Sequence, residues 1–267
     1  MFESLEPYLA IFRIGIKDNL AYKTDFALTS VFRLAGSLVM LLVWTAIYLA
    51  SHATSIGGFT LTAIYAYFFL INAVHYVIYS NIDEFIQDDV QSGSVASSLI
   101  KPIRYPLNLL FRTLSENALL IVVASLPLFA IVAAFYPLNL NAESIALLLA
   151  VVVIGNIVVM SLDFLIGSLS IYMTNIYGIM SVFWGVVSLL SGGIIPLSLF
   201  SQQTQSILFM LPFQLLAYTP ASILLGTISY AQAIHALFFG AAWAAGLSVF
   251  AYFWWERSVK KVMSAGG

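Results

Sequence analysis

Long apolar stretches alternate with short polar connections along most of the chain. A helix that crosses a bilayer needs about 20 mostly apolar residues, because backbone groups in hydrocarbon must find their hydrogen bonds inside the segment. We count six such stretches and favour six spans over the alternative of eight. They run from about Phe26 to Ala50, Phe59 to Ser80, Pro106 to Phe135, Ser144 to Met173, Tyr177 to Pro196 and Tyr230 to Trp255.

The residues before the first span, 1–25, have an amphipathic pattern. Apolar side chains recur at helical spacing, whereas Arg13, Lys17 and Asp18 fall largely off that stripe, which predicts a helix lying in the headgroup region. A solvated cap on the first span is the alternative. Glu3 and Glu6 stand where a secretory signal would be positive, so we expect no cleaved signal. The stripe consists of Leu5, Tyr8, Leu9, Phe12, Ile16 and Leu20.

The segment between the fifth and sixth spans, residues 197–229, is apolar but interrupted by Pro212, Pro220 and Gly226. Neither half is long enough to cross comfortably. Short apolar helices broken by proline are typical of a re-entrant hairpin, whose freed backbone groups must be satisfied by protein or by a water-filled cavity. The sequence therefore predicts an all-α polytopic membrane protein, with one amphipathic helix, six spans and one re-entrant hairpin.

Composition agrees with the pattern. Of 267 residues, 61% are hydrophobic and 8% are charged, against roughly 25% charged in a soluble domain. Because the chain has no cysteine, disulfides, thiolate metal sites, iron–sulfur clusters and cysteine nucleophiles are excluded. We expect no metal, no cofactor and no nucleic-acid partner on this chain.

The distribution of the basic residues orients the predicted spans. All ten lie on one side of the predicted membrane, and the connections around residues 52–58, 137–143 and 197–229 contain none. The positive-inside rule then places both termini, with the tail 256–267, in the cytoplasm, as an even number of spans requires. The basic residues are Arg13, Lys17, Lys23, Arg33, Lys101, Arg104, Arg112, Arg257, Lys260 and Lys261.

Residues 81–105 form the one long polar stretch, and this topology makes it cytoplasmic. An apolar stripe at helical spacing, a glycine suited to a helix C-cap at Gly93 and a serine suited to a second N-cap at Ser94 predict two short helices ending before Pro102. A solvated acidic loop is the alternative. The stripe consists of Ile82, Phe85, Ile86 and Val90.

The same stretch resembles a known coupling segment. A glycine followed six residues later by leucine and then by Lys-Pro, here Gly93, Leu99, Lys101 and Pro102, is similar to the coupling segment of ABC-2 type exporter permeases. The order of predicted elements, with a fifth span ending in Gly-Gly-Ile-Ile-Pro-Leu at residues 192–197, resembles that family over nearly the whole chain. It resembles in particular the compact bacterial permeases of viologen or multidrug exporters.

This resemblance implies a transport subunit that is not itself an enzyme, in a bacterial inner membrane. It implies a second permease, identical or homologous, an amphiphilic or lipid-like cargo, and separate ATP-binding subunits that hold ATP and magnesium. The chain contains no Gly-x-x-x-x-Gly-Lys-Ser/Thr loop. The implied contacts with the ATP-binding subunit are Phe85, Asp88, Asp89, Gln91, Ser92, Gly93, Ser94, Leu99, Lys101 and Pro102. The implied outer gate is Gly192, Gly193, Pro196, Pro212 and Pro220.

Ionisable residues inside predicted spans are functional candidates by default. Arg33 is near enough to the membrane edge to snorkel, and Arg112 and Glu116 are spaced to pair on one helix face. Asp163 has either a role in the pathway or a basic partner on a neighbouring span. For His75 we favour a hydrogen-bonded packing role.

Two other functional classes fit the sequence less well. An ion-coupled secondary carrier needs acidic residues near the membrane midplane and often has inverted repeats. Only Asp163 is suitably placed, and no repeat is apparent. An intramembrane enzyme would need paired carboxylates, a His-Glu-x-x-His helix or a serine–histidine pair, and we identify none of them.

Overall fold

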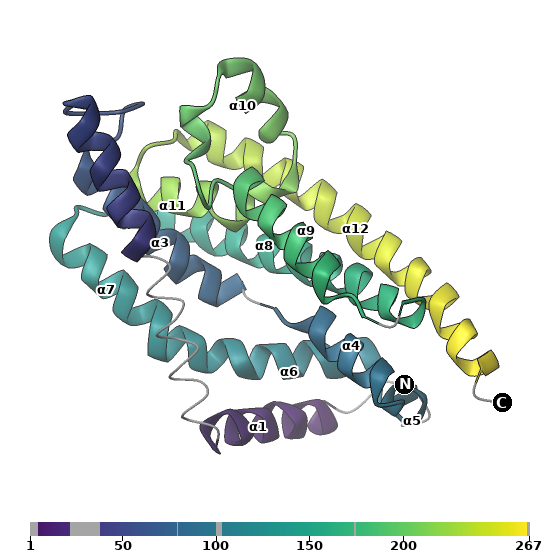
Figure 1. Cartoon of the computed structure of the whole chain (residues 1–267). Coiled ribbons are helices and arrows are strands. Elements are labelled where there is room, and N and C mark those ends of the chain that lie inside the picture. The colour runs from purple at the N-terminus through teal and green to yellow at the C-terminus, as the bar shows by residue number, and fades with distance from the viewer. Residues whose placement is uncertain (1–4, 22–37, 79, 100–102, 174, 266–267) are drawn as a thin grey trace.

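The computed structural model describes residues 5–21, 38–78, 80–99, 103–173 and 175–265. Helices dominate these ranges and none of their residues forms a β-strand; an isolated bridge joins Ile56 and Phe59. The all-α prediction is therefore confirmed. Figure 1 shows the helices as one bundle, with the far end of α12 and the short helices α4 and α5 at the same end of the molecule.

Six apolar helices lie where six spans were predicted. Four are long and apolar enough to cross a membrane, and two are shorter. The long spans cover Leu61–Ile78 (α3), Tyr105–Phe135 (α6 with α7), Ala142–Ile171 (α8 with a 3-10 turn) and Tyr230–Lys261 in α12. The shorter helices are Leu38–Ser51 and α9, Tyr177–Leu190. The beginning of the first predicted span, residues 26–37, lies outside the described residues.

The third span contains a local widening. It consists of α6 (Tyr105–Leu120), a π turn (Ile121–Ser125) and α7 (Leu126–Phe135), and a proline, Pro127, stands in the first turn of α7. Proline has no backbone N–H and clashes with the carbonyl four residues earlier in a regular α-helix. A π turn just before the proline opens the helix at that point, so the span continues without breaking.

The last span is longer than predicted. Helix α12 continues from Tyr230 to Ala265 without a break, through most of the residues expected to form a tail. Trp255 lies at the end of the sixth predicted span, where an aromatic residue is typically an anchor at the membrane interface, but it does not face lipid. It is buried and stacks on Tyr105 of α6, with ring centroids 5.1 Å apart.

The segment before α12 folds back into the bundle as a chain of short pieces. They are a 3-10 turn at Leu197–Leu199, α10 at Gln202–Leu208, a 3-10 turn at Pro212–Leu216 and α11 at Tyr218–Leu225. Every residue of α11 is buried, and α11 packs against α3 and α8. Helix α10 instead lies at the edge of the molecule, farthest from α4 and α5 (Figure 1).

Side chains and other backbone groups of the protein satisfy the irregular backbone of this segment, as the re-entrant prediction requires. The Tyr67 hydroxyl donates to the Gly192 carbonyl at 2.8 Å, and the amide of Gln214 donates to the Phe209 carbonyl at 2.7 Å. The backbone N–H of Tyr218 donates to the Ser191 carbonyl at 3.0 Å. Gly192 itself has φ of +89°, which favours glycine.

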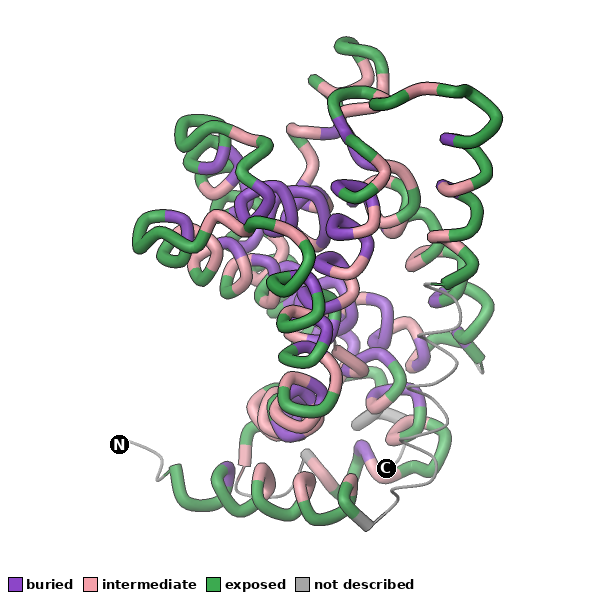
Figure 2. The backbone as a smooth tube through the Cα atoms, turned by 90° about the vertical axis from the view of Figure 1, so that its left-hand side faces the viewer, coloured by how far each residue is buried: buried purple, intermediate pink, exposed green. Residues whose placement is uncertain are grey.

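Buried residues line the contacts between the helices (Figure 2). The largest cluster joins Leu38–Ser51, α3 and α11. A second cluster joins α4 to α6, α8 and α12, and contains Ile82, Ile86, Leu109, Phe164 and Trp255. The short polar-stretch helix α4 is therefore part of a hydrophobic core and is not a solvated loop.

The amphipathic helix α1 (Glu6–Ala21) packs along α6. Tyr8, predicted as part of the membrane-facing stripe, instead is buried and stacks on Phe111, and its hydroxyl accepts from the backbone N–H of Arg104. Leu5, Leu9 and Leu20 of the same stripe are exposed. Helix α1 thus has one face on the protein and an adjoining apolar face that is available to lipid.

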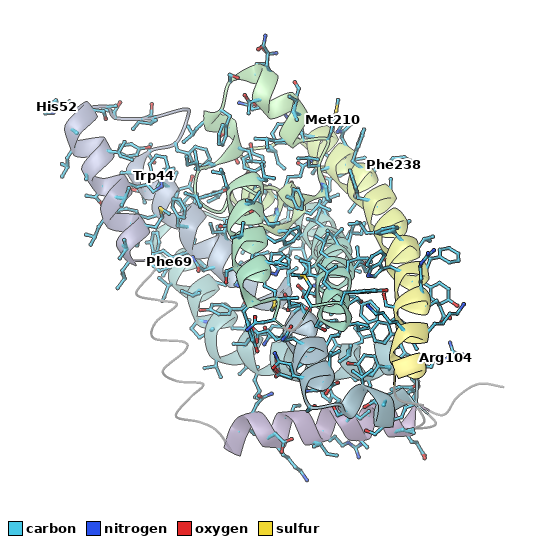
Figure 3. All side chains as sticks on the ribbon, turned by 45° about the vertical axis from the view of Figure 1, so that its right-hand side comes forward. Trp44, His52, Phe69, Arg104, Met210 and Phe238 are labelled. Atoms are coloured by element: carbon cyan, nitrogen blue, oxygen red, sulfur yellow. The ribbon has the colours of Figure 1, made fainter. Side chains whose placement is uncertain are left out.

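The elements that carry the described basic residues lie together at one end of the molecule, as the charge pattern predicts. Helix α1, the start of α6 and the end of α12 lie at the end of the molecule that carries α4 and α5 (Figure 1). Figure 3 shows Arg104 at this end, and His52 and Met210 toward the opposite end. The side of the membrane that each end faces remains a prediction from charge.

We expect Tyr67→Phe to destabilise the fold. The hydroxyl of this buried tyrosine supplies the hydrogen bond to the Gly192 carbonyl, and its loss leaves that carbonyl short of a partner, at a cost of about 1–3 kcal/mol. The thermal unfolding midpoint of the detergent-purified protein should fall. Tyr252→Phe, at an exposed tyrosine on α12, should leave it unchanged; equal shifts in both variants would contradict the assigned role.

Candidate functional site: the α4–α5 elbow and the adjoining cavity

The polar stretch folds into two short helices joined by a tight turn. Helix α4 spans Ile82–Gln91 and α5 spans Ser94–Leu99. Gly93 between them has φ of +73°, in the left-handed region that ends helices. The predicted helix–turn–helix is confirmed, and we call it the elbow. The Ser94 hydroxyl, expected to cap α5, donates to the Asp89 carboxylate at 2.9 Å.

One face of α4 is buried in the bundle against α8. The two helices approach closely at Gly167, where an added Cβ would lie 2.8 Å from the Cα of Asp83 and 3.0 Å from the Cβ of Ile86. Only glycine allows this separation, because any side chain would meet the backbone of α4. The elbow therefore rests directly on the backbone of a long span.

Three hydrogen bonds tie the same helix to α9 and to the turn before it. The indole Nε1–H of Trp184 donates to the Asp83 carboxylate at 3.2 Å. The backbone N–H of Ile176 donates to the side-chain carbonyl of Gln87 at 3.3 Å, and the Tyr177 hydroxyl donates to Asp88 at 3.3 Å. A displacement of α4 must therefore move α9 or break these bonds.

A third set of contacts joins the elbow to α6. The Tyr105 hydroxyl donates to Asp89 at 2.8 Å, and Nη1 of Arg112 lies 3.9 Å from the same carboxylate. The Arg112 guanidinium also lies over the Phe85 ring, 3.9 Å from its centroid, where a cation is attracted to the ring face. Asp89 and Phe85, expected to face a partner subunit, thus make contacts within this chain.

The opposite face of the elbow is open. Asp88, Gln91, Ser92 and Gly93 are exposed, and a Cβ at Gly93 would meet nothing within 4 Å. Of the other implied contact residues, Leu99 ends α5, and its side chain lies outside the described part of the chain, as do Lys101 and Pro102. Among the described residues, the exposed face therefore contains part of the set of contacts with the ATP-binding subunit that the family resemblance implies.

A cavity of about 510 Å³ adjoins the elbow. It runs between α3, α8 and α9, from Asp83 and Glu84 at the elbow to Gly193 and Ala217 beside the re-entrant segment. Its wall combines apolar, aromatic and polar side chains, and the described lining residues include no lysine or arginine. The lining also includes Asn72, His75, Tyr177, Met180, Ser181, Trp184 and Ser188.

The implied outer-gate residues lie around the far end of this cavity and in the re-entrant segment. Gly193 lines the cavity, and the carbonyl of its neighbour Gly192 is held by Tyr67. Pro196 precedes the 3-10 turn at Leu197–Leu199, and Pro212 and Pro220 are buried in the pieces that follow. Their role as a gate remains a prediction.

The intramembrane candidates have different surroundings. We expected Arg112 to pair with Glu116 on the same helix, and this was wrong, because Arg112 lies beside Asp89 of the elbow. The Glu116 carboxylate accepts a hydrogen bond from the Asn81 side chain at 3.2 Å. His75, expected to be a packing residue, is exposed and lines the cavity. Asp163 is fully buried, and neither of its side-chain oxygens has a hydrogen-bond partner in the described ranges. Arg33 lies outside those ranges.

Sequence reasoning missed the residues that attach the elbow. Asp83, Gln87, Gly167 and Trp184 were not candidates, because nothing in their local pattern separates an elbow contact from ordinary packing. One signal was present: Asp83 and Gln87 are spaced by four, so they share a helix face, and that face adjoins the apolar stripe of α4.

Burial changes the titration of Asp83. Desolvation raises the pKa of its carboxyl above the ordinary aspartate value, and hydrogen bonds from Trp184 and from the Glu84 backbone offset only part of that rise. The folded protein therefore binds a proton at Asp83 more readily than the unfolded chain does. The native state loses stability as pH rises from the unfolded value, about 3.9, through the raised value.

We therefore expect Asp83→Asn to flatten the pH dependence of stability. The unfolding midpoint of the wild-type protein should decline as pH rises from about 4 toward neutral, and the asparagine variant should decline less. Asp18→Asn, at an exposed position on α1, is the matched control. Parallel pH curves for wild type and Asp83→Asn would show that this carboxyl does not contribute.

Comparison with known proteins agrees with this architecture. Residues 34–266 match a family model described as ABC-2 family transporter protein, which covers all the described helices except α1. No curated protein matches the chain significantly. Among the described residues, no cluster of three or more histidine or acidic side chains could hold a metal ion. The chain is an integral membrane protein and belongs to the ABC-2 family, as a permease component of an ABC transporter.

Proposed function

We propose that this chain is the membrane subunit of an ATP-driven exporter in a bacterial inner membrane, with both termini in the cytoplasm. Permeases of this family generally work with ATP-binding subunits. In this proposal, separate ATP-binding subunits dock on the exposed face of the elbow, and ATP and magnesium bind there and not on this chain. Their movement drives an amphiphilic or lipid-like cargo outward.

The observation that carries the proposal is the two-sided environment of α4. One side is fixed to α8, α9 and α6 through Gly167, Trp184 and Asp89. The other side presents exposed polar residues at the end of the molecule that gathers the basic side chains. A helix held in this way can transmit a push from a soluble partner to the wall of the cavity, because Trp184 belongs both to the α4 attachment and to that wall.

The cavity supports an amphiphilic cargo. Its wall places Trp184 and Met180 beside Ser181 and Asn72, which suits a molecule with an apolar body and a polar part. Its volume of about 510 Å³ is within the range of small-molecule sites. We infer that a second permease, identical or homologous, completes the pathway, because the side of α9 away from the cavity is uncovered: Gly178, Val182, Gly185 and Val186 are exposed.

We expect a bulky charged residue at the elbow turn to abolish coupling. Gly93→Glu adds a side chain to the exposed face at a left-handed position, and should eliminate the cargo-stimulated ATPase activity of the complex purified from membranes. Gly58→Glu is a closely matched control: Gly58 also has positive φ and open space around a Cβ, but lies in the connection next to His52, at the opposite end. Coupled activity that survives Gly93→Glu, or is lost in both variants, would refute docking at the elbow.

We expect Trp184→Phe to preserve docking of the ATP-binding subunit on the elbow but to stop its movement from reaching α9. The variant keeps an aromatic ring but loses the N–H that binds Asp83, so the ATP-binding subunit should still co-purify while cargo no longer stimulates ATP hydrolysis. Trp243→Phe removes a comparable indole hydrogen bond, to the Met210 carbonyl at 2.8 Å, far from the elbow. It should retain stimulation. Normal stimulation in Trp184→Phe would show that α9 is not moved through this bond.

The alternative, an ion-coupled secondary transporter, is favoured by one observation, the buried and unpartnered Asp163. The two functions differ in their energy source. Uptake of cargo into inverted membrane vesicles that stops when ATP is withdrawn supports the ABC exporter, because the cytoplasmic face is outside in such vesicles. Uptake that continues without ATP but stops when an ionophore collapses the proton gradient would instead establish the secondary transporter.

A further inference from the structure

Asp163 is a buried acid that faces the attachment of the elbow. It precedes Gly167 by one helical turn on α8, so both lie on the face that meets α4. Its side chain is fully buried, and neither carboxyl oxygen makes a hydrogen bond of ordinary geometry among the described residues. The Ser80 side chain acts on the carboxyl as a weak hydrogen-bonding neighbour, and Asp83 and Glu84 act through their charge; all three are in or next to the first turn of α4.

No described cation is placed to balance a negative charge at Asp163. Arg112 of α6 lies beside Asp89 and over Phe85, and Lys261 of α12 lies over the Tyr172 ring. Among the described charged side chains, those that influence Asp163 electrostatically are two further acids, Asp83 and Glu84. Other titratable groups on neighbouring helices have other surroundings. His75 and Tyr177 line the cavity, and the Glu116 carboxylate accepts from the Asn81 side chain. The charged residues near the end of α12 are exposed: Glu256, Arg257 and Lys260.

An ionised carboxylate in this position would be a desolvated anion beside two other acids. Burying an unpaired charge is so unfavourable that such groups instead take up a proton. We propose that Asp163 is a proton-binding site, and that occupation of this site is linked to docking of α4 on α8.

The linkage follows from the geometry. While α4 is docked, the Asp163 carboxyl keeps its O–H bond, and a neutral acid can lie beside Asp83. When α4 withdraws, water reaches the carboxyl from the cavity, whose wall includes Ser80 and Asp83. The O–H bond breaks, the proton passes to water, and Asp163 becomes a solvated carboxylate. By reciprocity, a proton on Asp163 favours docking, and ionisation of Asp163 disfavours it.

The proton can be observed directly by infrared spectroscopy of the full chain in lipid nanodiscs at neutral pH. A protonated carboxyl has a C=O stretching band separate from that of a carboxylate. We expect such a band to be present, to disappear in Asp163→Asn and to persist in Glu143→Gln, which alters an exposed acid at the start of α8. A spectrum without a band that depends on Asp163 would overturn the site.

The linkage can be measured by cysteine accessibility, because the natural chain has no cysteine. Ile86→Cys places a single thiol on the buried face of α4, against Gly167. Ser97→Cys places one on the exposed side of α5 and corrects for the intrinsic rise of thiol reactivity with pH. Labelling by a water-soluble maleimide is compared between about pH 6 and pH 10, a window that spans ordinary thiol ionisation.

The reactivity of Ile86→Cys relative to Ser97→Cys should rise about tenfold per pH unit once Asp163 begins to ionise. In an Asp163→Asn background the rise should be smaller, because Asp83, whose carboxyl is also buried against α8, is then left to respond. A flat ratio with Asp163 present, or an equal rise in both backgrounds, would overturn the linkage. A ratio that responds to sodium concentration at constant pH would replace the proton with a metal cation. No ATP-binding subunit takes part, so these results stand apart from the proposed export function.

Discussion

The close approach of α4 to α8 at Gly167 is the constraint on which the rest of the structure depends. Because no side chain separates the two backbones there, the elbow behaves as part of the membrane bundle despite its polar sequence. The hydrogen bonds to Trp184 and Ile176 then extend this attachment to α9, and the Asp89 contacts extend it to α6. A short helix with few apolar residues is thereby held by three spans at once, and its burial brings Asp83 close enough to the buried Asp163 for the two acids to influence each other.

The distribution of polar contacts divides the molecule into two unlike halves. Away from the elbow, the large cluster of Leu38–Ser51, α3 and α11 is apolar and aromatic, and single hydrogen bonds such as Tyr67 to Gly192 repair breaks in the backbone. Beside the elbow, the cluster is smaller, and carboxylates and amides supply many of the contacts. Apolar packing is insensitive to pH, whereas polar contacts respond to a proton, a charge or a competing partner. Conformational change is therefore expected to begin beside the elbow.

Much of the architecture could be predicted from the sequence, because it follows from hydrocarbon length and from the position of charges. The apolar helices, the broken segment before α12 and the two-helix elbow with Gly93 at its turn were all readable. The partners of individual side chains were not. Arg112 could pair locally with Glu116, and only the fold places it against Asp89. Likewise, Trp255 looks like an interfacial anchor until α6 brings Tyr105 onto its ring. Long-range contacts of this kind depend on how the spans pack, which local periodicity does not encode.

The unbroken length of α12 has a consequence for the shape of the assembled transporter. Its 36 residues measure about 54 Å at 1.5 Å each, whereas the hydrocarbon layer is about 30 Å thick. Even with a generous tilt, a rod of this length extends past the lipid by several turns. Since its far end lies at the same end of the molecule as the elbow, a soluble body seated on the elbow would also lie beside the end of this helix.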